Sequence, residues 1–281
     1  MIKLIFFTYF FIMFYDISIK FSCIVTSKTI TLYKSVQLIQ KNIIETRQKT
    51  VWYSPYHIPL FITIVKLSEY KKAISIQPYQ FRNIQILDLT FYHQHKTKSS
   101  DICKLINLTS LNLNYCYHPK IKSSDICKLI NLTLLDLSGC NQIEMKSSDI
   151  CKLINLISLN LGYCNQPEMK SSDICKLTNL TSLNIRGCDQ YEMKSNDICK
   201  LINLTLLDLS GCNQIEMKSS NICKLINLIS LNLRCCDQPE MKSSDICKLT
   251  NLTSLNLNHC YNPEMKSNDI KKNIPNIKII E

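Results

Sequence analysis

Apolar residues recur with a period of 24 from residue 99 to residue 266. Each repeat unit is close to SSDICKLINLTSLNLxxCxxPEMK, and the seven full units begin at Ser99, Ser123, Ser147, Ser171, Ser195, Ser219 and Ser243. Leu111 and Leu113 of the first unit alternate with polar neighbours, as in a strand about four residues long that buries one face. Ile102, Leu105 and Leu108 lie three apart, which predicts a helical or 3₁₀ turn.

These two elements have to stack on copies of themselves. One unit buries too little apolar surface to offset the entropy of ordering its backbone, so its neighbours must complete its core. Stacking places the strands roughly 4.8 Å apart in a parallel sheet on the concave side, with the helical turns on the convex side. We therefore expect an α/β solenoid of about eight strands, in which the Ser-Ser-Asp that opens each unit caps the helical turn.

Leu108, Leu111, Leu113 and Cys116 form the pattern L-x-x-L-x-L-x-x-C, which resembles the template of leucine-rich repeats. The segment SDI-x-x-L-x-N-L-T-S-L is similar to the short internalin-type repeat. Cysteine at the usual asparagine position instead resembles the cysteine-containing class found in many F-box adaptor proteins, so two subfamilies stay open. The resemblance implies a protein-binding scaffold without enzymatic activity, whose concave strands and adjoining loops form the contact surface.

We expect three regions along the chain: a hydrophobic segment 1–23, a capping region 24–82, and the solenoid 83–281, with full units at 99–266. The stretch RNIQILDLTFY, which ends at Tyr92, keeps the repeat register and predicts a degenerate first strand. Residues 267–281 begin an eighth unit, slip by one residue and stop within its strand. Such an end is frayed, paired with another chain or truncated relative to a longer ancestor.

The N-terminal region leaves several interpretations open. The apolar run Leu4–Tyr15 is too short to span a bilayer and has the length of a signal peptide, so it is a secretory signal, a membrane anchor or a buried cap. Ile58–Leu67 predicts a capping strand or helix. Pro59 and Leu60 faintly resemble an F-box, although the later tryptophan of that family is absent. A substrate-recognition subunit of a ubiquitin ligase and a secreted or surface recognition protein are therefore the alternative functions.

The formal charge of +11 is concentrated outside the repeats. Residues 1–98 hold 13 Lys/Arg and 4 Asp/Glu and account for +9, which leaves +2 for the remainder. Because the repeat array is nearly neutral, we expect no nucleic-acid partner. We also expect no membrane partner unless the N-terminal segment is an anchor.

Fourteen of the sixteen cysteines form two ladders with the period of the repeat. The first is Cys116, Cys140, Cys164, Cys188, Cys212, Cys236 and Cys260, and the second is Cys103, Cys127, Cys151, Cys175, Cys199, Cys223 and Cys247. No CxxC pair or nearby histidine set suggests a metal. We interpret both ladders as small buried side chains, the first bonding the backbone as asparagine does. So many thiols favour a reducing, cytoplasmic location, with a secreted or membrane-anchored protein as the alternative.

Catalytic, cofactor-binding and metal-binding residues are not expected. The five histidines form no HExxH motif, and a chain with four glycines offers no glycine-rich phosphate loop. Five Asn-Leu-Thr sequons lie at fixed positions of the units, and we interpret them as part of the repeat framework; they are Asn107, Asn131, Asn179, Asn203 and Asn251.

The repeat copies differ mainly at the end of the strand and in the next turn. Units at Ser123 and Ser195 are almost identical, which indicates that a block of three units was duplicated. The differences reflect either divergence of a binding surface or the tolerance of turns. If a protein partner binds there, the candidate contact residues are Asn114, Tyr115, Tyr117, Asp136, Tyr163, Arg186, Asp208, Arg234, Asp237, His259 and Tyr261.

Overall fold

Ten parallel strands form one open sheet, in which every strand pairs with its neighbours in sequence. The computed structural model describes residues 64–66 (backbone only), 85–90, 102–116, 121–140, 145–164, 168–188, 194–212, 217–236 and 239–281. The strands are β1 (Ile64–Lys66), β2 (Ile86–Asp88), β3 (Ser110–Asn112), β4 (Leu134–Asp136), β5 (Ser158–Asn160), β6 (Ser182–Asn184), β7 (Leu206–Asp208), β8 (Ser230–Asn232), β9 (Ser254–Asn256) and β10 (Lys278–Ile280).

The expected solenoid is confirmed, with three-residue strands and a longer sheet than predicted. Leu111 pairs with Leu135 and Leu135 with Leu159, so from β2 onward each residue of a strand pairs with the residue 24 positions later. The two additional strands lie at the ends of the array. β1 falls within the segment expected to be a capping strand or helix and pairs with β2, and β10 completes the last unit.

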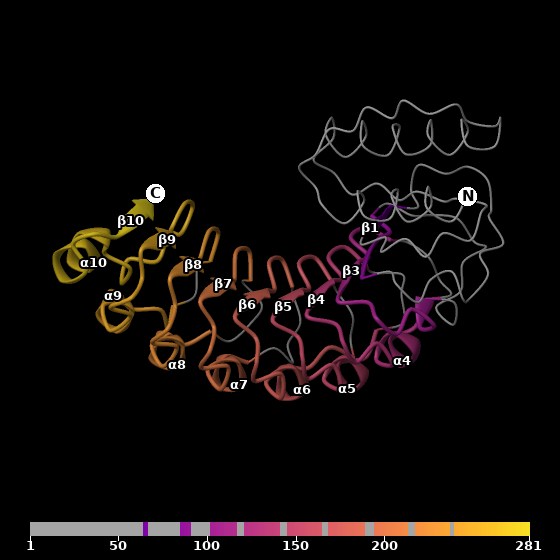
Figure 1. Cartoon of the computed structure of the whole chain (residues 1–281). Coiled ribbons are helices and arrows are strands. Elements are labelled where there is room, and N and C mark those ends of the chain that lie inside the picture. The colour runs from indigo at the N-terminus through magenta and orange to yellow at the C-terminus, as the bar shows by residue number, and fades with distance from the viewer. Residues whose placement is uncertain are drawn as a thin grey trace, which may run out of the picture.

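One helical turn per unit covers the outer side of the arc, and the strands line its inner side (Figure 1). These helices are α4 (Ser123–Ile126), α5 (Ser147–Ile150), α6 (Ser171–Ile174), α7 (Ser195–Ile198), α8 (Ser219–Ile222), α9 (Ser243–Ile246) and α10 (Ser267–Asn273). After each four-residue helix the chain continues in i→i+3 hydrogen bonds, as in Leu129 N–H to Ile126 and Leu132 N–H to Leu129. The predicted convex turns are therefore α-helical at first and then 3₁₀-like.

The expected capping by Ser-Ser-Asp is wrong. Each four-residue helix begins at its first serine, is preceded by a lysine in extended conformation, and has no side-chain cap. The buried Ser147 hydroxyl instead donates to the Asp173 carboxylate of the next unit at 2.7 Å and accepts the Lys170 N–H at 3.1 Å. The serine fails as a cap because it lies one position too late, and it bonds adjacent units together instead.

The shift of one residue in the last unit is absorbed by a longer helix. α10 has seven residues, and the Ile274 N–H bonds the Ile270 carbonyl across a full α-helical turn. Ile277 is buried and Ile279 returns to register opposite Leu255. A slip in the sequence pattern therefore does not shift the register of the sheet.

Cysteines of the first ladder bond the backbone of the preceding unit, as expected. Cys140 Sγ donates to the Leu113 carbonyl at 2.7 Å, and Cys236 Sγ donates to the Leu209 carbonyl at 2.7 Å. Burial raises the pKa of the Cys236 thiol to about 12, so it stays protonated and able to donate. The second ladder differs from the prediction because its described members, except Cys199, are only half-buried at the helix ends. All described cysteines are free thiols.

The expectations for the N-terminal segments largely concern residues outside the described ranges. These include the signal or anchor at Leu4–Tyr15 and the F-box resemblance near Pro59. Among the described residues, no helix combines the length and apolar character needed to cross a bilayer.

Candidate protein-binding face

The concave face presents two rows of side chains, from the first and third residue of each strand. The third residue is Asn or Asp in every described strand from β2 to β9. Its Oδ1 accepts the N–H two residues later, for example Ser138 N–H to Asp136 at 2.9 Å and Arg186 N–H to Asn184 at 2.9 Å. This bond fixes both the side chain and the start of the turn, so the row is rigid before any partner binds.

Asp136 and Asp208, two of the three acidic members of this row, have additional partners. Asp136 also accepts the Ser138 hydroxyl and, through Oδ2, the amide of Asn160 at 3.0 Å. Asp208 makes the same contacts with Ser210 and with Asn232, again at 3.0 Å for the amide. Both carboxylates therefore face the concave side already oriented by their own and the following unit.

From β3 to β9, the first residue of each strand is serine except in two units. Leu134 and Leu206 take that position and remain 40% and 46% exposed. They were not among the candidate residues, although the change from Thr-Ser-Leu to Thr-Leu-Leu marks both positions in the sequence. Two exposed leucines thus stand next to the two aspartates, three strands apart.

A left-handed residue ends the turn after each strand from β3 to β9. The seven residues in this conformation, which we call the corner row, are Tyr115, Gly139, Tyr163, Gly187, Gly211, Cys235 and His259, with φ between 48° and 69°. The corner N–H donates to the next unit, as in Tyr163 N–H to the Arg186 carbonyl at 2.6 Å. Residues other than glycine have a conformational cost in this left-handed region. The hydrophobic pattern does not reveal this conformation, although glycine in three of the seven copies is a signal for it.

Tyrosines of the corner row lie over the glycine of the next unit. A Cβ placed on Gly139 would come within 2.6 Å of the Tyr115 ring, and one on Gly187 within 2.5 Å of the Tyr163 ring. The Arg186 guanidinium lies 5.3 Å from the centre of the Tyr163 ring, within cation–π distance. Each tyrosine therefore occupies the space that a missing side chain leaves in the next unit.

The other candidate residues surround this corner row. Asn114 donates to the Ser138 hydroxyl, and Arg186 and Arg234 are exposed at the equivalent position of later units. His259 is exposed with Nδ1 3.4 Å from the hydroxyl of Tyr261, whose side chain is 77% exposed. The two remaining candidates lie outside the described residues; they are Tyr117 and Asp237.

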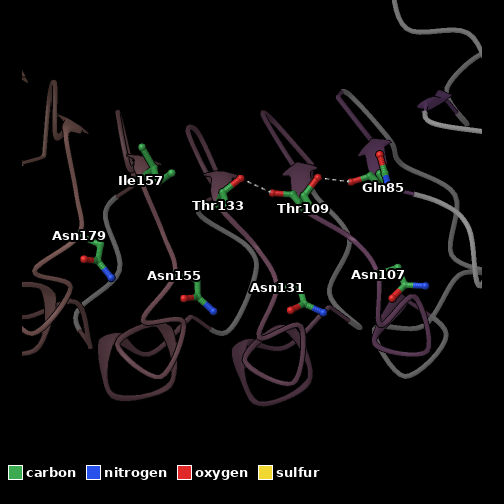
Figure 2. A pocket seen from close by; sticks show the side chains of 8 residues that line it. All are labelled: Gln85, Asn107, Thr109, Asn131, Thr133, Asn155, Ile157 and Asn179. Carbon is green, nitrogen blue, oxygen red and sulfur yellow. Dashed lines mark hydrogen bonds between the residues drawn. The ribbon is translucent and has the colours of Figure 1, made fainter.

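A groove of about 770 Å³ lies on a different surface, along the flank that leads from the helical turns to the strands. Figure 2 shows its two rows: asparagines near the helical turns and residues at the start of the strands. The lining residues are Gln85, Asn107, Thr109, Asn131, Thr133, Asn155, Ile157 and Asn179. Within the described residues, no group of three or more His, Cys, Asp or Glu side chains could hold a metal ion.

Comparison with known proteins identifies the fold. No protein-family model and no curated protein matches the chain. Two internalin structures from Listeria monocytogenes are similar, each 20% identical with a TM-score of 0.55. The match covers 72% of this chain and 55% of internalin InlF, so the chain spans about half of that structure's length; for internalin C2 the shares are 73% and 84%. With one strand and one helical turn in the repeat and this likeness to solved structures, the chain has the leucine-rich-repeat fold.

Proposed function

We propose that this protein is a non-catalytic scaffold that binds a protein partner through its concave face and the adjoining corner row. One observation carries the proposal: exposed side chains on and beside the concave face differ between units, whereas the asparagines that bond each unit to the preceding one recur without change. Arg186, Arg234 and Tyr261 are exposed, and interfaces derive most of their energy from arginine and aromatic side chains.

The concave face also combines apolar and charged side chains, both of which contribute to protein interfaces. Leu134 and Leu206 offer exposed apolar contacts, and Asp136 and Asp208 offer oriented carboxylates beside them. Since strands are roughly 4.8 Å apart, the two pairs are about 14 Å apart along the sheet. A protein surface with apolar contacts and donors at two such positions would engage both pairs at once.

The convex face supports the proposal by contrast. Asp125 bonds Lys128 and Asp149 bonds Lys152, each at 2.7 Å, and the same pair recurs in later units. An ion pair that recurs in most units presents nearly the same surface along the array, and ion pairs at the surface contribute little to stability. Such a surface offers little basis for selecting a partner. The free thiols of both ladders are consistent with a cytoplasmic location, which we propose as well.

Affinity capture with matched variants tests this function. The concave variant combines Arg186→Ala, Arg234→Ala and Tyr261→Ala, and the convex control combines Lys152→Ala and Lys176→Ala. All five side chains are exposed, so both proteins should unfold at the same temperature as the unmodified chain. After expression in its own kind of cell, each protein is captured and its bound proteins are quantified by mass spectrometry.

We expect the amount of protein bound to the concave variant to fall at least about tenfold, since each lost hot-spot side chain removes more than about 1 kcal/mol of binding free energy. The convex control should keep them. Loss with the control and retention with the concave variant would place the contact on the convex side and reject the proposal.

A further inference from the structure

We propose that two copies of this chain associate through the uncharged flank that carries the groove of Figure 2. We define the flank by the four residues that precede each strand: 106–109, 130–133, 154–157, 178–181, 202–205, 226–229 and 250–253. None of these residues is ionisable in any unit. A partner can therefore cover the flank without removing a charge from water.

Exposed aliphatic side chains recur along the flank between its asparagines. Seven of them are between 45% and 61% exposed: Ile106, Ile130, Ile154, Ile157, Ile202, Ile226 and Ile229. A fully buried side chain of this size removes on the order of 100 Å² from water, so seven half-exposed ones offer several hundred Å². Monomeric proteins rarely leave that much apolar surface exposed. Together with the polar groups between them, these side chains approach the roughly 800 Å² that each partner buries in a stable interface.

The polar groups on the flank already have partners within the chain. Asn131 Nδ2 donates to the Ile106 carbonyl at 2.9 Å, and Thr133 Oγ1 donates to the Thr109 carbonyl at 3.1 Å. The equivalent asparagine bond recurs in each of the following five units. A polar group that keeps its hydrogen bond costs little to bury. The flank can therefore lose water more readily than its asparagines and threonines suggest.

The spacing of the units favours a second copy as the occupant. Successive units lie closer together on the concave side than on the convex side, because the helices form the outside of the arc and the strands the inside (Figure 1). A partner that contacts every unit must show the same change of spacing across its surface. A second copy does so when a twofold axis runs from the concave to the convex side, because this operation preserves the curvature of the arc.

This arrangement makes the two arrays antiparallel and places both concave faces on the same side of the dimer. Identical flanks meet, as in an isologous interface. The concave faces stay open, so the dimer would present two binding faces to one partner or to two. The inference goes beyond the proposed function and does not depend on the identity of the partner.

Sedimentation of the full chain tests the dimer. We expect twice the 32.6 kDa mass of the chain at tens of micromolar. Replacing Ile154 and Ile202 by Asp places charges within the interface and should raise the dissociation constant at least about 100-fold. The control places the same two charges on the convex face of the same units, by Ser148→Asp and Asn196→Asp, and should dimerise as the unmodified chain does.

A second, milder pair guards against a loss of folding. Ile154→Thr and Ile202→Thr use the residue that the array itself has at the equivalent Thr178 and Thr250. These variants should weaken the dimer about tenfold, because each removes apolar contact but adds no charge, and should keep the circular dichroism spectrum. A monomer at about 100 μM, or dimers unaffected by any flank substitution, would overturn the proposal. A monomer whose flank isoleucines are protected from hydroxyl-radical oxidation would reveal another occupant and overturn it as well.

Discussion

The two ends of each strand obey different constraints. Before the strand begins, asparagine bonds a carbonyl group of the preceding unit in the same way along the array, as at Asn131 and Asn155. Where the strand ends, the corner row changes from tyrosine to glycine, cysteine and histidine without any change in backbone conformation. A side chain that joins two units has to match its partner, so the asparagine stays the same along the stack. Side chains that only cover the next unit can vary.

Variation in the corner row is nevertheless constrained in pairs. The Tyr115 and Tyr163 rings fit because the next unit has glycine, at positions 139 and 187. Gly211 differs because a Cβ placed on it would meet no ring, and its nearest contact would be the Gly187 Cα at 3.8 Å. Glycine in the corner row therefore has two roles. At all three positions it permits the left-handed turn, and at Gly139 and Gly187 it also makes room for a tyrosine ring.

Replacing Gly187 or Gly211 by alanine separates these two roles. We expect the largest loss of stability from Gly187→Ala. Both positions have positive φ, so Gly211→Ala should cost about 1 kcal/mol of unfolding free energy from backbone strain alone. Gly187→Ala should cost about 3 kcal/mol, because its Cβ also displaces the Tyr163 ring. Urea unfolding followed by circular dichroism gives both values.

Removal of the ring provides the control. In a Tyr163→Ala background, Gly187→Ala should cost no more than Gly211→Ala does, because the displaced atoms are gone. An unchanged cost would assign the whole effect to backbone strain. The pairing of Tyr163 with Gly187 would then be only coincidental.

Ser147 lies at the opposite kind of position, where one side chain bonds two units together. Replacing it tests how much such a bond contributes to stability. The side chain is fully buried and its hydroxyl bonds both Asp173 and the Lys170 N–H. Ser147→Ala leaves the Asp173 carboxylate and the Lys170 N–H without this hydrogen-bond partner. It should lower the free energy of unfolding by about 2 kcal/mol. The control is Ser148→Ala at the next, exposed position of the same helix, which should change stability by less than about 0.5 kcal/mol. Equal effects at the two serines would show that the buried bond does not join the units.

The period of 24 was sufficient to predict the sheet, its register and the side on which the helices lie, since only one stacking buries Leu111 and its equivalents. It was also sufficient to assign the first cysteine ladder, because a small donor at that position meets the backbone of the preceding unit. The serine caps were wrong because the hydrophobic pattern places a helix only to within a residue or two, and a cap depends on that residue.

The candidate site was harder to predict than the fold. Which residues face the concave side follows from the alternation in each strand, but the left-handed corner at Tyr163 does not follow from any apolar pattern. Nor did the sequence reveal the ring lying over Gly187, since that contact joins residues of different units. Exposed leucines such as Leu134 were missed because apolar residues were assigned to the core.

Replacing Asp173 should have the smallest effect on stability. It tests whether the serine–aspartate hydrogen bonds between successive helices depend on charge. Hydrogen bonds from Lys176 and Ser147 hold the pKa of this carboxyl below its ordinary value of about 3.9. Its contribution is therefore present at neutral pH and is lost as pH falls below about 4 and through the folded-state pKa. The array already contains an amide at the equivalent Asn221, which donates to the Ser195 hydroxyl at 3.1 Å. Asp173→Asn should thus cost less than about 1 kcal/mol at pH 7, and the difference from the unmodified chain should shrink between pH 5 and pH 2.5. Urea midpoints measured across this range check the trend, and a difference that stays constant with pH would mean that the ionised carboxylate does not contribute.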